Sequence, residues 1–292
     1  MENLSDEELE RRYNALDLPP EQRWENLDIS NDFMFFKVMH NAKICRGLLL
    51  SRILPNIEIG RIKFVETQKV MQDNIDSRGV RFDVYAKSGK RVYNIEMQNV
   101  NEDDLPKRIR CYHAAIDNAA MEKGSMKRYA DMPETFVIFI CKFDLFNKGR
   151  HIYTFKNFCC EDKSIELKDC STSIFLNAKG IMNDVSPELK AFLNLVLGKS
   201  SDDKFVKDIE EILSTARHSS EWRREYIMTS LWLRDRDEKQ RIKSFNEGKE
   251  QGLQEGEERG IIKVAKSMLL GGANISDILR YTGLSLEELK SL

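Results

Sequence analysis

The sequence predicts a mixed α/β fold, in which helices flank a central mixed sheet and a helical extension follows towards the C-terminus. Residues 79–86 and 92–98 alternate apolar and polar side chains with a period of two, as half-buried strands do. Residues 104–123 switch to the 3.6-residue period of an amphipathic helix, and residues 135–141 form an apolar run typical of a strand buried on both faces. This order of strand, strand, helix and buried strand favours a mixed sheet with helices packed against it.

Composition and charge narrow the range of functions. The 292 residues carry a formal net charge of −2, so no overall basic field attracts nucleic acid and DNA affinity must come from local clusters. The cysteines are scattered without a C-x-x-C pair, which favours a reducing compartment over a disulfide framework. The longest apolar run, residues 136–141, is too short to span a bilayer, and the acidic N-terminus lacks a signal peptide's apolar stretch. We therefore expect a cytoplasmic protein that binds no membrane.

The N-terminal part of the chain precedes the strand pair with helices and one more strand. Residues 1–27 are polar and charged, and we expect a short helix and a linker there. Residues 30–54 place apolar side chains at helical spacing, with Ser30 or Asn31 as the N-cap. Residues 62–71 have the pattern of a strand.

The part of the chain after the buried strand changes from strands to helices. Two further strands are expected near residues 151–157 and 172–177, and the pattern becomes helical after Gly180. Residues 221–246 indicate a long charged helix, and the glycine-spaced residues 247–260 a solvated helix or a linker. We divide the chain into a polar N-terminal segment, a core, a helical region and a small helical tail, which comprise residues 1–27, 28–183, 184–246 and 247–292.

The strand pair places two acidic side chains near each other. A two-residue loop at residues 88–89 puts Asp83 opposite Asn94 and diagonal to Glu96. Period-two geometry then gathers these three side chains and that of Gln98 on one face. The other face of the pair, which suits a core, carries Phe82, Val84, Tyr93, Ile95 and Met97.

Two carboxylates held close together on rigid strands indicate a cation site. They repel each other unless a cation lies between them, and oxygen ligands of this kind favour Mg²⁺ or Mn²⁺. The alternative is that Asp83 and Glu96 are solvent-facing strand residues, one of them paired with Arg81 or Lys90. The residues alone leave both interpretations open.

The pattern D-(x)12-E-x-Q, formed by Asp83, Glu96 and Gln98, resembles the metal-binding centre of the PD-(D/E)xK phosphodiesterase superfamily. The chain is most similar to the Rpn family of bacterial recombination-promoting nucleases and predicted transposases. This resemblance covers roughly residues 28–292. It also depends on an opening helix, a basic helix, an L-N-x-K-G element and a glycine-spaced acidic tail, which match residues 31–39, 105–112, 175–180 and 247–260.

The resemblance implies a restriction-endonuclease-like core and a role for each residue of the centre. Asp83, Glu96 and the Met97 carbonyl would bind Mg²⁺ or Mn²⁺, and Asp32 would complete the acidic set. Asp32 is equally well explained as a first-turn carboxylate that the helix dipole favours. Gln98 replaces the commoner lysine, so it would orient water through hydrogen bonds without supplying charge. A polar strand end is the alternative interpretation of Gln98.

A basic cluster follows the strand pair. Lys107, Arg108 and Arg110 lie on the predicted helix, and Tyr112 can support them with a hydrogen bond, so we predict that these four residues contact nucleic acid. Arg110 is the favoured member because a guanidinium fork suits phosphate. The alternative is a solvated helix face, which is the usual place of such charges.

The resulting prediction is a Mg²⁺-dependent DNA endonuclease of low sequence specificity, linked to recombination or mobile elements. The rival is a catalytically inactive nuclease fold that binds partners or self-associates. Both hypotheses allow a homodimer through the C-terminal helices.

Overall fold

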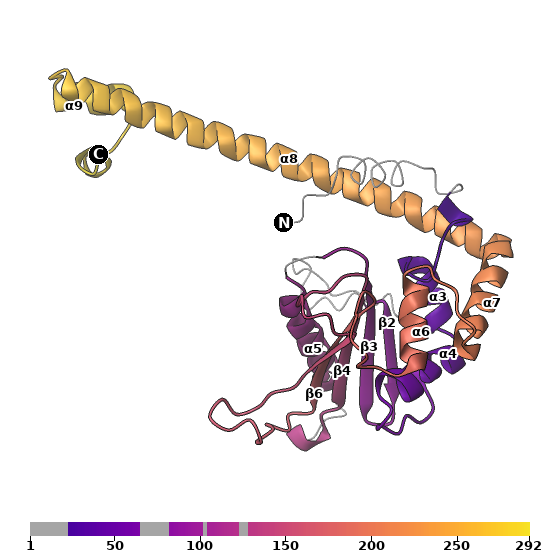
Figure 1. Ribbon diagram of the computed structural model, residues 1–292. Coiled ribbons are helices and arrows are strands. Elements are labelled where there is room, and N and C mark those ends of the chain that lie inside the picture. The colour runs from indigo at the N-terminus through magenta and orange to yellow at the C-terminus, as the bar shows by residue number, and fades with distance from the viewer. Residues whose placement is uncertain (1–22, 65–81, 102–103, 123–127) are drawn as a thin grey trace. The chain divides into compact units, whose positions relative to one another are not determined.

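The computed structural model describes residues 23–64, 82–101, 104–122 and 128–292 (Figure 1). Predictions for the N-terminal helix, for most of the strand at 62–71 and for Arg81 lie outside these residues. The chain divides into two compact units, one up to Tyr226 and one from Ile227 to Leu292, and each is described by itself. This division falls inside a helix, and the four-part division made from the sequence stays a prediction.

The first unit contains a six-stranded mixed sheet in the order β1-β2-β3-β4-β6-β5. β2 pairs antiparallel with β1 and β3, β3-β4 and β4-β6 are parallel, and β5 is an antiparallel edge strand. The predicted mixed sheet is therefore confirmed. The strands are β1 (Lys63–Phe64), β2 (Val84–Ser88), β3 (Arg91–Gln98), β4 (Glu134–Cys141), β5 (Ile152–Phe155) and β6 (Ser171–Asn177).

The central strand β4 is the apolar run that the sequence marked. All of its residues except Glu134 are buried, and parallel neighbours flank it on both edges. A parallel strand covered on both faces needs apolar side chains at every position, which explains why the run does not alternate.

The loop of the β2–β3 hairpin differs from the prediction by one residue. The ladder runs from Val84↔Ile95 to Ser88↔Arg91, so the loop is Gly89–Lys90. Gly89 has a φ of +60°, which suits the first central position of a type II′ turn. The same register, continued by one residue, places Asp83 opposite Glu96 and not opposite Asn94. Because the pairing shifts by two residues, the side chains keep their faces.

Helix α5 (Leu105–Glu122) covers the face of the sheet that carries the acidic residues. Its apolar stripe packs against the sheet, so Asn94 and Glu96 are buried beneath it. Phe82 belongs to this face, contrary to prediction, because its ring lies 5.1 Å from that of Tyr85 and 5.4 Å from that of Tyr112. The regular strand starts only at Val84, so the alternation does not extend back to Phe82.

The opposite face of the sheet is covered by helices from both ends of the first unit (Figure 1). Asn31 caps the first of them and accepts hydrogen bonds from two backbone N–H groups, so of the two predicted caps Asn31 is the one used. Besides α5 and the start of α8, the helices described in this unit are α3 (Asp32–Met39), α4 (Ala42–Leu48), the π-helical η1 (Leu49–Ile53), the 3₁₀ turn η2 (Tyr129–Asp131), α6 (Pro187–Val196) and α7 (Lys204–His218).

The second unit consists of helices. α8 (Ser220–Leu270) starts in the first unit and is continuous, so the glycine-spaced residues 247–260 are helical and not a linker. α9 (Ile275–Thr282) and α10 (Leu286–Lys290) follow, and Ile278 and Leu289 form a small core with Ala265. Among the described helices, none combines the length and apolar character that a bilayer crossing requires.

Candidate active site

The hairpin brings Asp83 and Glu96 into direct contact near the carboxyl end of β3. The backbone N–H of Asp83 donates to Oε1 of Glu96 at 3.1 Å. The backbone N–H of Met97 in turn donates to Oδ2 of Asp83 at 3.0 Å. Each carboxylate is therefore held by the backbone of the other's strand, which fixes the two acids on rigid elements.

Glu96 is the buried member of this pair. Its side chain is 2 % exposed, and the hydroxyl of Tyr112 donates to Oε2 at 2.9 Å. Burial raises the pKa of Glu96 well above its usual range, and the neighbouring Asp83 carboxylate raises it further. The hydrogen bonds from Asp83 and Tyr112 oppose this shift without cancelling it. A buried carboxyl in this state binds a proton or a cation readily.

Arg108 connects the carboxylate pair to Gln98. Its guanidinium donates to Oε1 of Gln98 at 3.3 Å and to the hydroxyl of Tyr112 at 3.4 Å. Burial raises the pKa of Tyr112 well above its usual range, while the charge of Arg108 lowers it. Tyr112 therefore stays protonated and acts as a hydrogen-bond donor to Glu96.

The four predicted nucleic-acid contacts separate into two pairs. Arg108 and Tyr112, one helical turn apart, face the sheet, whereas Lys107 and Arg110 are exposed. Tyr112 is 5 % exposed, so its hydroxyl is engaged inside the site and not at the surface where the sequence analysis placed it. The favoured residue Arg110 points away from the carboxylates because it lies two residues from Arg108 on a helix of 3.6 residues per turn.

Asp32 is the third acidic residue that the resemblance implies. It is the first residue of α3 and is exposed, although the amide of Asn99 donates to the carbonyl of Ser30 and brings the start of this helix beside the end of β3. In the part of the chain that the structure describes, no group of three or more His, Cys, Asp or Glu side chains could hold a metal ion. The role of Asp32 in a three-acid set therefore stays a prediction.

Lys142 is a site neighbour that the sequence analysis missed. It follows β4 directly, and its backbone N–H donates to the carbonyl of Gln98 at 3.0 Å. Its ammonium donates to Oγ of Ser30 at 2.6 Å and lies 3.8 Å from Asp28. The parallel pairing of β3 with β4 brings Lys142 here, and a pairing between distant segments leaves no local sequence signal.

The donor set fits a divalent cation of the Mg²⁺ class. Asp83 and Glu96 offer hard carboxylate oxygens, and the burial of Glu96 penalises its negative charge unless a positive charge compensates it. These two residues would hold the cation.

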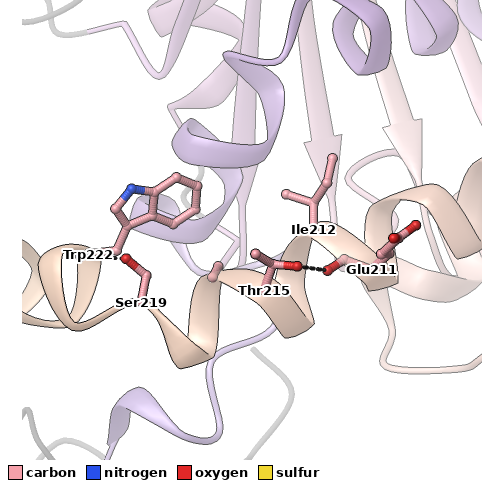
Figure 2. Close-up of a pocket in the computed structure, with 6 residues that line it drawn as sticks. Glu211, Ile212, Thr215, Ser219 and Trp222 are labelled. Carbon is pink, nitrogen blue, oxygen red and sulfur yellow. Dashed lines mark hydrogen bonds between the residues drawn. The ribbon is translucent and has the colours of Figure 1, made fainter.

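A hollow lies on α7 and the first turn of α8, apart from the predicted site residues (Figure 2). It measures about 390 Å³ and is lined by Glu211, Ile212, Thr215, Ala216, Ser219 and Trp222. Thr215 donates to the carbonyl of Glu211, and Ser219 accepts from the N–H of Trp222. The hydroxyls are thus engaged by their own helices, and no predicted site residue lines this hollow.

The fold is of the restriction-endonuclease-like class, with two carboxylates on an antiparallel hairpin of a mixed sheet. Residues 30–185, more than half of the chain, match a family model described as PD-(D/E)XK nuclease family transposase. The chain belongs to this family, which confirms the resemblance drawn from the sequence motifs and the predicted fold class. No curated protein and no solved structure was found to match the chain.

Proposed function

We propose that this protein is a Mg²⁺- or Mn²⁺-dependent DNA endonuclease that cuts with little sequence preference. The observation that carries the proposal is the reciprocal contact of Asp83 and Glu96 across the hairpin, in a chain that belongs to a nuclease family. Membership of a transposase family supports a role in recombination or mobile elements. A reducing, cytoplasmic location fits the six free cysteines and is part of the proposal.

In this proposal each residue of the hairpin site has a separate role in the reaction. Asp83 and Glu96 hold the cation together with the Met97 carbonyl. When bound, a divalent cation polarises the phosphodiester and lowers the pKa of a bound water. Gln98 orients the attacking water, and Tyr112 holds the Glu96 carboxylate in place through its hydrogen bond.

DNA binding is assigned to the exposed basic side chains of α5. Lys107 and Arg110 contact the phosphate backbone, which gives affinity without sequence preference. Asp32 lies at the start of α3, beside the end of β3, and we propose it as an outer residue of the acidic set.

One plasmid experiment tests the proposed reaction. Supercoiled plasmid is incubated with Mg²⁺ or Mn²⁺ and the wild-type protein, Asp83→Asn, Glu96→Gln or Glu250→Gln. Glu250 is an exposed carboxylate of α8 and serves as the matched control. We expect nicking by the wild type and the control and its loss in the two hairpin variants. Equal nicking by all four proteins means a contaminating nuclease and rejects the proposal.

The second candidate function is a nuclease-derived binding protein without activity. Gln98 in the lysine position and the missing three-acid cluster of the described residues favour it, as does the exposed middle of the 51-residue α8. It retains the proposed homodimer through the C-terminal helices. Calorimetric titration with Mn²⁺ separates the candidates, because a scaffold without the site binds no cation and an enzyme must. Light scattering that gives a monomer mass at micromolar concentration removes the homodimer.

A further inference from the structure

The contacts of α5 with β3 repeat at matched intervals. Tyr112 contacts Glu96, and Arg108, four residues earlier on the helix, contacts Gln98, two residues later on the strand. Four helical residues advance about 6 Å and two strand residues about 6.6 Å. The helix therefore runs antiparallel to β3. In this register Glu96 contacts Tyr112 and Gln98 contacts Arg108.

We propose that Arg108 is a catalytic residue that supplies the positive charge which neutral Gln98 cannot supply to the reacting phosphate. This inference rests on the proposed function, because it assigns a role within the same site. Negative charge grows on the non-bridging oxygens during attack on phosphorus, and a fixed cation directed at them stabilises that state. Gln98 itself can only donate and accept hydrogen bonds.

The position of Arg108 suits this role. The guanidinium is half-buried, and its central carbon lies 5.8 Å from the centre of the Phe139 ring, so the fork is held against the sheet. Its contacts with Gln98 and Tyr112 hold it at the end of β3, beside the carboxylate pair. A planar guanidinium matches two oxygens of one phosphate, which a single ammonium does not.

The chemical step balances without proton transfer by the arginine. The water oxygen forms a bond to phosphorus while the ester bond between phosphorus and the leaving sugar oxygen breaks. The attacking water gives its proton to solvent, and the leaving oxygen takes one from solvent. Arg108 stays protonated throughout and donates hydrogen bonds to the non-bridging oxygens, with the divalent cation of the proposed function bound by the acids.

Arg110 provides a comparison on the same helix, as a proposed phosphate-backbone contact outside the carboxylate pair. It carries the same charge two residues further on, is exposed and faces away from Gln98. A merely electrostatic attraction of DNA to α5 would depend on both arginines alike. A catalytic role depends on Arg108 alone.

The test measures plasmid nicking at varied plasmid concentration, and separately the binding of a labelled DNA duplex in Ca²⁺, for Arg108→Gln, Arg108→Lys and Arg110→Gln. We expect Arg108→Gln to lower kcat by about 100-fold while KM and duplex affinity change by less than about threefold. Arg108→Lys keeps the charge and should lose no more than about tenfold in kcat. Arg110→Gln should instead weaken duplex binding and raise KM, because Arg110 is proposed to contact the phosphate backbone.

A double variant that moves the positive charge from the helix to the strand separates a catalytic role of Arg108 from a structural one. A purely structural role of Arg108 would not be restored by a charge on the strand. Adding Gln98→Lys to Arg108→Gln returns a cation to the strand, and we expect kcat to recover at least about tenfold. An unchanged kcat in Arg108→Gln, equal loss in the Lys and Gln variants, or no recovery by Gln98→Lys in a folded double variant overturns the inference.

Failure of this inference differs from failure of the proposed function. A wild-type protein that does not nick, or an Asp83→Asn variant as active as wild type, removes both. An active wild type, an inactive Asp83→Asn variant and a fully active Arg108→Gln variant overturn the role of Arg108 alone.

Discussion

Two polar clusters lie beneath α5, and they are built in opposite ways. Around His113, the ring nitrogens lie 2.9 Å from Oγ1 of Thr135 and 3.1 Å from Oγ of Ser173. The His113 ring is neutral near pH 7, since burial lowers its pKa to about 4, although the charge of Asp169 opposes this shift. The second cluster contains Glu96, Tyr112 and Arg108. Burial raises the pKa of the Glu96 carboxyl, and the carboxylate of Asp83 raises it further.

The difference between these clusters separates a structural arrangement from a functional one. A buried polar group whose partners are neutral hydroxyls fastens a helix to a sheet and needs nothing from outside. A buried carboxyl beside another carboxylate is stable only with a proton or a bound cation. The Glu96 cluster thus has a deficit of positive charge, and the His113 cluster has none.

The largest effect that tests this comparison is expected from Glu96→Gln. If the charge of Glu96 serves a cation, the variant should lose nicking by on the order of 10³-fold, about 4 kcal/mol in the barrier. In EDTA it should also unfold less readily than the wild type above neutral pH. The folded pKa of Glu96 is raised, so its contribution to stability is present below the ordinary value of 4.5 and is lost as pH rises.

Urea unfolding in EDTA from pH 5 to pH 9 measures this stability. Glu250→Gln, an exposed carboxylate change, is the control and should follow the wild-type pH dependence. A Glu96→Gln variant that is both inactive and less stable than wild type at pH 9 would mean that Glu96 is held by structural partners and not by a cation.

The His113 cluster should respond to pH with the opposite sign. The pKa of His113 falls from 6.5 to about 4 on folding, so its neutral form stabilises the fold above pH 6.5. That contribution, about 3 kcal/mol at most, is lost as pH falls from 6.5 towards 4. We expect His113→Gln to flatten this part of the stability curve in urea unfolding.

The matched control for the His113 variant is His218→Gln, which changes an exposed histidine at the end of α7. Because the ring of His113 is mostly buried, the effect should persist in high salt. A stability curve that falls equally steeply between pH 6.5 and 4 in wild type and His113→Gln would contradict a neutral structural role for this ring.

The two acidic residues of the Glu96 cluster could be predicted from the sequence, because side chains alternate along a strand with a period of two. Asp83 and Glu96 were expected on one face, and that survived an error in the loop because a shift of two residues preserves faces. The error itself followed from choosing residues 88–89 for the loop, whereas Gly89 takes the first turn position. The family resemblance then supplied the fold class.

Two basic residues that contact Gln98, namely Arg108 and Lys142, could not be predicted in the same way. Which of Arg108 and Arg110 faces Gln98 depends on the rotation of α5 against the sheet. The apolar stripe does not decide this for a residue at its flank. One signal was present in the sequence. Arg108 and Tyr112 are four residues apart on a helix, which is about the same length as the two residues between Glu96 and Gln98 on a strand. Lys142 reaches Ser30 only through the parallel pairing of distant strands, so no local pattern marks it.

The smallest expected effect comes from Tyr112→Phe, which sharpens the comparison within one helix turn. The variant removes the hydrogen bond to Glu96 and keeps the ring that packs 5.4 Å from Phe82. Losing one buried hydrogen bond should cost about 1–2 kcal/mol of unfolding free energy.

Tyr112→Phe should also raise the pKa of Glu96 further, because the lost bond favours the charged carboxylate. The acid limb of the nicking pH profile should therefore move to higher pH, by an amount that shrinks as Mn²⁺ is raised, since cation and proton compete for Glu96. His113→Gln, the neighbouring change, should leave that limb in place. A limb that stays in place in Tyr112→Phe would mean that Glu96 does not titrate in the reaction.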